Sequence, residues 1–506
     1  MTGGQVWLVA ALAMPALGAA VTAALPDRAA RLAGTGFAAV AFLASLALYL
    51  VTGDRAGVPI VTEADEVVPA IRPWHQLDLP WVPGLDLRFH LGVDGISYPL
   101  VVLTALLTLL CCGYTVWKVP EGGSGRALIA LLLVIEVGIL GTFLALDLVL
   151  FFVFFEVVLL PMYAVIAGWG GDDRRHAARK FVLYTLFGSV LLLVGVFTVV
   201  ASAGTADIAQ LTGGADLPRT TQLVAFILLA LAFAVKSPLW PLHSWLPDAH
   251  TQAPTVGSVI LAGVLLKMGT YGLIRVAVGV APEGAQWAAP VLGALAVAAI
   301  IVGSLVCLAQ DELKRLIAYS SVGHMGFVLL GIATLTATGI QAALIGNIAH
   351  GLITGLLFFL AGAIKDRAHT GRLAELGGMR EASPRLAGLL GFAAIASLGL
   401  PGLAGFWGEA FAVIAAVEVG GPLWTTLGAV AAIGAALTAA YFLRLLRRVT
   451  HGPASPAVAT VRPGLATAEV TAWAPLVVLA LVVGLLPAVV LGLSDPSVTT
   501  LMDVLP

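Results

Sequence analysis

Long apolar runs separated by short polar segments repeat along almost the whole chain. Each run holds about 20 residues, which is enough for an α-helix to cross about 30 Å of hydrocarbon. Residues 127–145 and 223–235 are apolar on every helical face, whereas the strands of a membrane barrel alternate apolar and polar positions. The pattern therefore predicts an all-α polytopic membrane protein and argues against a barrel.

Proline, glycine and charged residues interrupt the apolar runs and divide the chain into about fourteen predicted transmembrane helices. These helices are expected near residues 5–24, 34–51, 93–117, 127–146, 148–168, 176–201, 222–248, 256–279, 286–308, 314–333, 341–364, 385–417, 424–449 and 470–491. All of them belong to a single membrane domain that covers residues 1–506. The longest early connection, residues 52–92, contains several prolines and is predicted to be an outer loop.

Two of the predicted helices contain an internal break. Residues 236–247 of the seventh helix hold three prolines, and residues 397–408 of the twelfth combine Pro401 with clustered glycines. Proline removes a backbone donor and clashes with the preceding turn, so a broken helix survives at membrane depth only where protein or water satisfies the freed backbone. Paired breaks predict two inverted repeats, residues 127–279 (helices four to eight) and 286–449 (helices nine to thirteen).

Lysine and arginine are distributed unevenly between the predicted loops. If the N-terminus lies outside, 19 of the 26 fall on the inner side, five fall on the outer side, and Lys236 and Lys267 fall within the membrane. Basic residues favour the cytoplasmic side, so this arrangement predicts that both termini lie outside. Because no basic residue precedes the first apolar run, we expect a retained helix there and not a signal peptide.

Composition and charge exclude several other functions. The chain is 60% hydrophobic and only 11% charged, against roughly 25% charged in soluble proteins, so we expect its surface to contact the lipid bilayer. A formal net charge of −2 with scattered basic residues argues against a nucleic-acid partner. Cys111, Cys112 and Cys307 lie in apolar runs without zinc or haem spacing, so we expect no metal or other cofactor in this chain.

Several ionisable residues lie inside predicted membrane segments. A charge near the bilayer centre costs about 2.5–3.5 kcal/mol on insertion scales, so a retained one is a functional candidate with a partner. Carboxylates, lysines and histidines can pass a proton when burial brings their two protonation states close in energy. The pattern therefore predicts a proton relay. Its candidate residues are Glu156, Lys236, Lys267, His324, His350 and Glu409.

A purely structural explanation stays open for several of these residues. Glu156 and Lys236 would then form a static ion pair that fixes helix packing, although a buried pair is weak support for stability. His324 and His350 would each hydrogen-bond a neighbouring helix. Lys267 has no evident counter-ion near it in the sequence, so a structural role explains it less well.

Four further residues are candidate accessory groups. Glu136 is embedded in the apolar sequence of the fourth helix, where it either joins the relay or pairs with a helix end. His243, Asp248 and His250 follow the first break. Because polar side chains satisfy free backbone groups at helix ends, we expect these three residues to cap the broken helix.

Four segments resemble the antiporter-like membrane subunits of respiratory NADH:quinone oxidoreductase (complex I). They are residues 151–163 (FFVFFEVVLLPMY), 236–255 (KSPLWPLHSWLPDAHTQAPT), 313–326 (LKRLIAYSSVGHMG) and 405–411 (GFWGEAF). The resemblance covers nearly the whole chain, and the second segment alone is a long match. In that family a lysine on the broken seventh helix pairs with a glutamate on the fifth.

This resemblance implies a role for each relay candidate. Lys236 and Glu156 match the family's lysine and glutamate pair, Lys267 matches the next relay lysine, and His324 and His350 match its bridging histidines. Protons are then expected to enter from the cytoplasm near the seventh and eighth helices.

Glu409 matches the family's terminal group on the broken twelfth helix. That group is a glutamate in M-type members and a lysine in several sister subunits, so the resemblance is to the M type. The family implies a proton-pumping subunit in a bacterial inner membrane. Its partners are the other membrane and peripheral subunits of complex I, including sister antiporter-like subunits. NADH, FMN, iron–sulfur clusters and quinone are expected in those partners.

Three other functions stay open from the sequence. A cation/proton antiporter subunit and the membrane arm of a related hydrogenase complex both resemble this fold. A structural scaffold, whose buried charges only fix helix packing, is the third. Substitution of Lys236 separates the last from a pump, because a scaffold would lose assembly whereas a pump would assemble and lose proton transfer.

Overall fold

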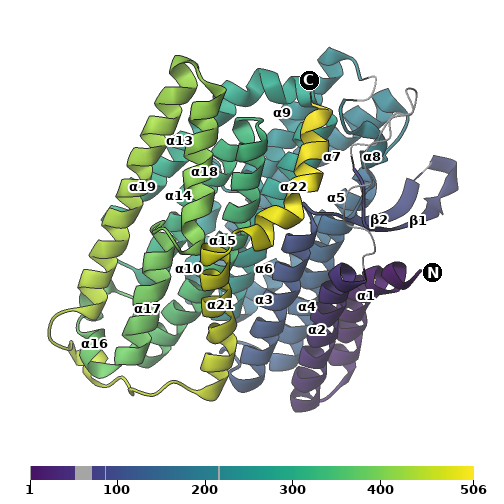
Figure 1. Ribbon diagram of the computed structural model, residues 1–506. Coiled ribbons are helices and arrows are strands. Elements are labelled where there is room, and N and C mark those ends of the chain that lie inside the picture. The colour runs from purple at the N-terminus through teal and green to yellow at the C-terminus, as the bar shows by residue number, and fades with distance from the viewer. Residues whose placement is uncertain (1, 52–70, 86, 215–216, 506) are drawn as a thin grey trace.

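A computed structural model of the chain describes residues 2–51, 71–85, 87–214 and 217–505. In these ranges, thirteen helices are apolar and long enough to cross a membrane. Most of them run side by side in one bundle, with α1 and α2 at one flank and α13 and α19 at the other (Figure 1). The predicted all-α membrane fold is confirmed, while the count of fourteen crossings and the inverted repeats stay predictions.

The first half of the bundle follows the predicted helices closely, except that its second helix begins earlier, at Asp27. The span predicted at 148–168 is interrupted by Val158, which divides it into two shorter helices. The elements are α1 (Gly3–Ala24), α2 (Asp27–Leu50), α3 (Tyr98–Trp117), α4 (Gly125–Leu144), α5 (Leu148–Val157), α6 (Leu159–Trp169), α7 (Arg174–Ala203), α8 (Ile208–Leu211) and α9 (Arg219–Lys236).

The second half contains the broken and irregular helices, and it ends in a helix, α22, that the sequence pattern did not predict. The elements are α10 (Trp245–Gln252), α11 (Thr255–Ile260), the π-helical η2 (Leu261–Leu265), α12 (Leu266–Gly272), the π-helical η3 (Leu273–Val278), α13 (Pro282–Ala309), α14 (Leu313–Ala333), α15 (Ala337–Ala368), the 3₁₀ turn η4 (Leu373–Glu375), α16 (Met379–Ala382), α17 (Pro384–Ser397), α18 (Ala404–Val419), α19 (Gly421–Thr450), α20 (Pro456–Ala459), α21 (Thr467–Leu485) and α22 (Ala488–Asp503).

Both predicted helix breaks are confirmed. Helix α9 ends at Lys236 and α10 begins at Trp245, so the chain leaves the α-helical conformation over the first two prolines of the motif. The indole Nε1 of Trp245 donates to the carbonyl of Val235 across this break, at 3.0 Å. The second break separates Ser397, where α17 ends, from Ala404, where α18 begins.

The most deeply buried helices form the centre of the bundle. In the span Thr255–Val278 the whole apolar window is buried, and in α15 the buried share is 94%. In α7 and α19 it is 33%, and large apolar side chains such as Leu183 and Phe187 are exposed on α7. The outer helices are therefore positioned to contact lipid or other subunits, while the central ones hold the buried polar groups.

A β-hairpin lies within the predicted outer loop 52–92, whose residues 52–70 are outside the described ranges. Strands β1 (His75–Val82) and β2 (Leu87–Val93) pair antiparallel, with the turn η1 (Pro83–Leu85) between them. His90 joins the hairpin to the segment before α8 through Asp207, at 3.2 Å. Burial opposes ionisation of Asp207, but hydrogen bonds from His90 and the backbone outweigh it and hold the pKa of this carboxyl below its usual value.

Candidate functional site

Lys267 lies at the centre of the bundle, on the short helix α12 between two π-helical segments. Its side chain is fully buried. The Nζ atom donates to the carbonyl of Ala262, five residues earlier, at 2.6 Å, and lies 2.6 Å from Nδ1 of His350. Because π-helical turns often occur at functional sites, the π-helical segments on both sides of Lys267 are consistent with a functional role for this lysine. A buried ammonium bonded to an imidazole can exchange a proton with it.

His350 continues the line of polar groups from α12 onto α15. Its Nδ1 faces Lys267, while its Nε2 has no hydrogen-bond partner within the described part of the chain. The ring centroid of His350 lies 5.8 Å from that of His324 on α14. Both rings line the same small cavity, so water held there can carry a proton between the two imidazoles.

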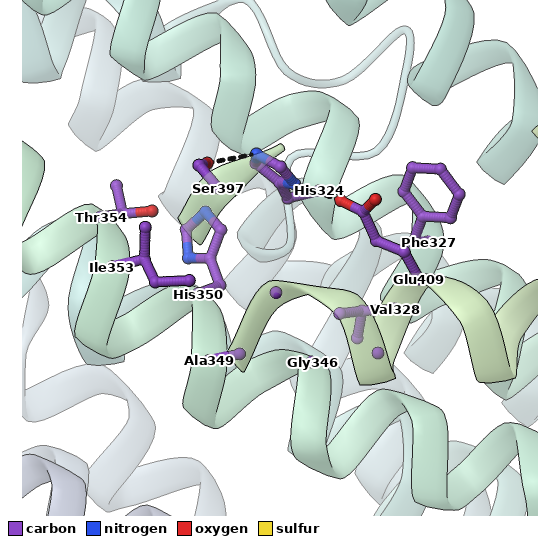
Figure 2. A pocket seen from close by; sticks show the side chains of 12 residues that line it. His324, Phe327, Val328, Gly346, Ala349, His350, Ile353, Thr354, Ser397 and Glu409 are labelled. Atoms are coloured by element: carbon purple, nitrogen blue, oxygen red, sulfur yellow. Dashed lines mark hydrogen bonds and ion pairs between the residues drawn. The ribbon is translucent and has the colours of Figure 1, made fainter. Parts of the chain in front are cut away.

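His324 connects this line to both halves of the broken twelfth helix. Its Nδ1 lies 2.9 Å from Oε1 of Glu409 on α18, and its Nε2 lies 3.0 Å from the hydroxyl of Ser397 on α17. Figure 2 shows the imidazole between these two groups. If Nδ1–H donates to the carboxylate, Nε2 is left to accept from the Ser397 hydroxyl, so the two contacts favour one tautomer.

A small cavity adjoins these side chains. It has a volume of about 30 Å³, and its walls include His324, His350, Thr354, Ser397 and Glu409. A cavity of this size holds about two water molecules, provided that polar groups are present to bind them. The cavity therefore offers a place for water between the two histidines and the carboxylate of Glu409 (Figure 2).

Close backbone packing fixes the position of Glu409. A Cβ atom on the preceding residue, Gly408, would lie 2.6 Å from Cα of Gly346 on α15. Only glycine allows the two helices to approach so closely, because any side chain there would force them apart. A similar contact sets α12 against α9, since a Cβ on Gly269 would lie 2.8 Å from the backbone nitrogen of Ser237.

A second polar contact supports the central lysine. The hydroxyl of Thr270 on α12 donates to the side-chain oxygen of Asn347 on α15, at 3.0 Å. Thr270 lies three residues after Lys267, and Asn347 lies three residues before His350, so each pair shares one helix face. The Thr270 and Asn347 contact therefore holds together the same two faces that present Lys267 and His350.

Glu156 and Lys236 lie near each other, apart from this central line. No ion pair within 4.0 Å joins the two in the described structure. The carboxylate of Glu156 instead accepts a hydrogen bond from the hydroxyl of Ser189 on α7. The Nζ atom of Lys236 lies 4.8 Å from the ring centroid of Phe155, as in a cation–π contact, and Glu156 acts on it electrostatically.

The accessory candidates do not share one environment. Glu136 is fully buried on α4, and neither of its carboxylate oxygens has a hydrogen-bond partner among the described residues. It therefore neither pairs with a helix end there nor bonds to the central line. His243 packs its ring edge-on against Tyr319, with centroids 6.2 Å apart.

The expected capping is contradicted for Asp248 and His250, whereas His243 bonds the backbone of Pro241 within the break. Helix α10 begins at Trp245 without a side-chain cap bond. Asp248 lies in its first turn, but its carboxylate pairs with Lys180 at 2.7 Å and with Arg315 at 3.4 Å. These cations compete for the carboxylate, which explains why it does not bond the helix terminus. His250 is fully buried near the end of α10, far from the terminus that needs acceptors.

Sequence reasoning missed the neutral partners of the charged residues. Ser189, Ser397, Thr270 and Asn347 supply hydrogen bonds at the site, but small polar residues are common in apolar helices and carry little signal alone. Ser397 had one available cue, because it begins the second break.

In the described ranges, no three His, Cys, Asp or Glu side chains converge as metal ligands would.

The chain is similar in sequence to proteins of a known family. The family described as "NADH:quinone oxidoreductase/Mrp antiporter, TM" matches residues 145–434. NADH-quinone oxidoreductase subunit M of Rhodobacter capsulatus is 42% identical over 438 residues, which cover 84% of each chain. The subunit M of Rickettsia prowazekii is 39% identical over 425 residues, covering 83% of this chain and 85% of the relative.

Solved structures share the same fold. A chain of respiratory complex I from Thermus thermophilus with bound NADH superposes with a TM-score of 0.86 at 30% identity, covering 99% of this chain and all of that one. A chain of the Mrp complex from Dietzia sp. DQ12-45-1b gives a TM-score of 0.84 at 24% identity, covering 99% of this chain and 98% of that one. At that identity the second comparison supports the fold alone.

Proposed function

Because the chain belongs to the NADH:quinone oxidoreductase/Mrp antiporter transmembrane family, we propose that it is a proton-translocating membrane subunit of NADH:quinone oxidoreductase. The observation that carries this proposal is the line Lys267, His350, His324 and Glu409, which crosses from α12 to α18 through contacts of hydrogen-bond length and a small cavity that both histidines and Glu409 line. Buried ionisable groups in an otherwise apolar bundle are costly, and a proton path accounts for the whole set at once.

Each residue of this line has a defined part in the proposed path. Lys267 passes a proton to Nδ1 of His350, whose free Nε2 releases it toward water in the cavity. His324 takes up a proton and delivers one to the carboxylate of Glu409 through the Nδ1 contact. Ser397 holds the imidazole in the orientation that this transfer needs.

Glu156 and Lys236 are proposed to act as a switch for the line. The carboxylate is now held by Ser189, so the pair is in an open arrangement. At an effective dielectric constant of about 20, separating two charges from roughly 4 to 8 Å costs about 2 kcal/mol. Moving a proton against roughly 180 mV requires about 4 kcal/mol. One pair is therefore insufficient alone, and the drive must come from redox chemistry in other subunits.

The redox cofactors are proposed to lie in partner subunits. The names of the relatives describe subunits of an NADH-oxidising, quinone-reducing complex, so NADH, FMN, iron–sulfur clusters and quinone are assigned to the other chains. This subunit then contributes to the reaction as a translocase, without a redox centre of its own. Its place is the bacterial inner membrane, beside sister antiporter-like subunits.

Identification of the chains that copurify with this protein tests the assignment. Detergent-solubilised membranes carrying a tagged chain are expected to yield NADH- and quinone-binding subunits together with sister membrane subunits. Recovery of only cation/proton antiporter subunits, or of hydrogenase subunits, would replace the proposed complex with one of those assemblies. The curated relatives at about 40% identity favour the NADH-linked complex.

The proposed topology counts α17 and α18 together as one broken crossing, the twelfth in chain order, which brings the total to fourteen and places both termini outside. A matched pair of introduced thiols tests it: Leu79→Cys on the hairpin and Asp173→Cys before α7, both at exposed positions. The three native cysteines are buried, so background labelling should be low. In intact cells a membrane-impermeant maleimide is expected to label position 79 and spare position 173.

Permeabilised cells provide the control for this labelling, because both thiols should then react. If position 173 is labelled in intact cells while position 79 reacts only after permeabilisation, the orientation is reversed. Two inverted repeats, residues 127–279 and 286–449, are also proposed, because each contains one of the two helix breaks.

A further inference from the structure

A large polar cavity opens at one end of the bundle, apart from the small cavity beside Glu409. It has a volume of about 800 Å³ and is formed by the ends of α3, α6, α10 and α15 with the loops beside them. Lys118, Asp366, Lys365 and Lys314 contribute charges of both signs to its wall. A space of this size and polarity holds many water molecules, and all of these lysines belong to the side predicted to be cytoplasmic. We call it the vestibule.

Lys314 lies where the vestibule meets the first broken helix. It is the second residue of α14, its side chain is only 5% exposed, and it nevertheless lines the vestibule. Its Nζ atom donates to the carbonyl of Ala253, at 2.9 Å. Ala253 stands between α10 and α11, and the following Pro254 has no N–H group. The lysine thus bonds the carbonyl of the residue that follows the last turn of α10, and an ammonium has three N–H donors, so it can make other contacts as well.

His250 lies close to the carbonyl that Lys314 bonds: the hydroxyl of Ser258 contacts the carbonyls of both His250, at 3.0 Å, and Ala253, at 3.4 Å. Its imidazole is fully buried and stacks on the ring of Phe358, with centroids 4.6 Å apart. Neither ring nitrogen has a hydrogen-bond partner within the described ranges. Both Lys314 and Lys267 act on this imidazole electrostatically. A buried imidazole whose two ring nitrogens are unpartnered, and on which two buried lysines act electrostatically, is suited to receive a proton at one nitrogen and release it from the other.

We propose that Lys314 is the residue through which cytoplasmic protons leave the vestibule and enter the buried path toward His250 and Lys267. Its ammonium releases a proton toward His250 on α10 and is reprotonated by water of the vestibule, so one proton is gained for each one lost. The inference rests on the proposed pumping function, which supplies the reason for a proton path. It assigns to Lys314 a function beyond its hydrogen bond to Ala253.

Two substitutions separate proton transfer from a structural role. Lys314→Arg keeps the positive charge and the N–H donors, but a guanidinium does not release its proton under physiological conditions. Lys314→Gln keeps donors and loses the charge. Both variants are expected to assemble and to lose proton translocation by at least about tenfold in NADH-energised membrane vesicles. Arg175→Gln is the matched control, since Arg175 is an exposed cation on the same predicted side and does not line the vestibule, so its loss should leave pumping unchanged.

Either Lys314 variant pumping at the parental rate would overturn the proposal and leave Lys314 with only the structural function of bonding the Ala253 carbonyl at the end of α10. Absence of pumping by the parental complex would instead contradict the proposed function itself, so the two failures are distinguishable. A third measurement does not depend on Lys314 variants folding. In an assembled Gln252→Cys complex, a bulky maleimide attached within the vestibule is expected to suppress pumping, whereas unchanged pumping after complete labelling would overturn the route.

Discussion

Replacing Lys236 with alanine is expected to lower NADH-driven proton pumping by at least about tenfold while the complex still assembles. Lys236 is the last residue of α9, buried at the first helix break with its ammonium beside the Phe155 ring. Its removal leaves the Glu156 carboxylate without its basic partner, so the proposed switch has one state only. The measurement is proton translocation and NADH oxidation in the same membrane vesicles, with assembly followed on native gels.

Graded substitutions at the same pair provide the controls. Glu156→Asp should be milder than Lys236→Ala, because the charge survives and only its reach is shortened. Ser189→Ala removes the hydrogen bond that now holds Glu156, so it should favour the paired state and slow pumping without abolishing it. Near-parental pumping by an assembled Lys236→Ala complex would exclude the switch, and failure of that variant alone to assemble would support the scaffold alternative.

The helices and their breaks were predictable because they depend on local rules. Apolar length determines which segments cross a membrane. Clusters of proline or of proline with glycine, as at residues 236–247 and 397–408, interrupt a helix, whereas the single prolines Pro15 and Pro290 lie within continuous helices.

The hairpin was missed for a physical reason: Pro80 lies within β1 and two charged residues, Asp78 and Arg88, interrupt its two strands, so the local pattern is weak. Its pairing depends on contacts with other parts of the chain, such as His90 with Asp207.

The π-helical turns on both sides of Lys267 were also beyond the sequence pattern. An α-helix and a π-helix of the same apolar residues differ by one hydrogen-bond register, and residues 261–278 are apolar throughout most of their length. The helical register bears on the proposed proton path, because the ammonium of Lys267 bonds the carbonyl of Ala262, five residues earlier, and contacts His350 from that position. Tertiary packing in this fully buried span decides the register.

The charged residues of the site stood out in the sequence because each interrupts an apolar run. Their grouping did not follow from that rule: the structure brings Lys267 to His350 and His324 to Glu409, and it leaves Glu136 apart from them. Lys314 illustrates the opposite case. In the sequence Lys314 was counted only as one of the basic residues that mark the cytoplasmic side. Its burial and its hydrogen bond to the Ala253 carbonyl distinguish it from the exposed basic residues there.

Glu409→Gln is expected to lower proton pumping and coupled turnover by roughly a hundredfold while assembly survives. Glutamine keeps the size of the side chain and still accepts from Nδ1 of His324, at the 2.9 Å contact that Glu409 makes. It cannot ionise, so the proposed last step of the line is blocked even though the packing at Gly408 and Gly346 is undisturbed. Proton translocation and NADH oxidation in vesicles, compared at equal amounts of assembled complex, measure the effect.

Glu409→Lys tests whether the terminal group must be an acid or only an ionisable one. The resemblance to complex I subunits implies that several sister subunits have a lysine at the position of Glu409. A buried lysine can also take up and release a proton. Near His324, however, an ammonium meets an imidazole where a carboxylate stood, so the proton-bearing hydrogen bond of Nδ1 loses its acceptor. We therefore expect partial pumping, between the glutamine variant and the parent. If the glutamine variant pumps at the parental rate, Glu409 is a packing residue and the proton path ends at another group.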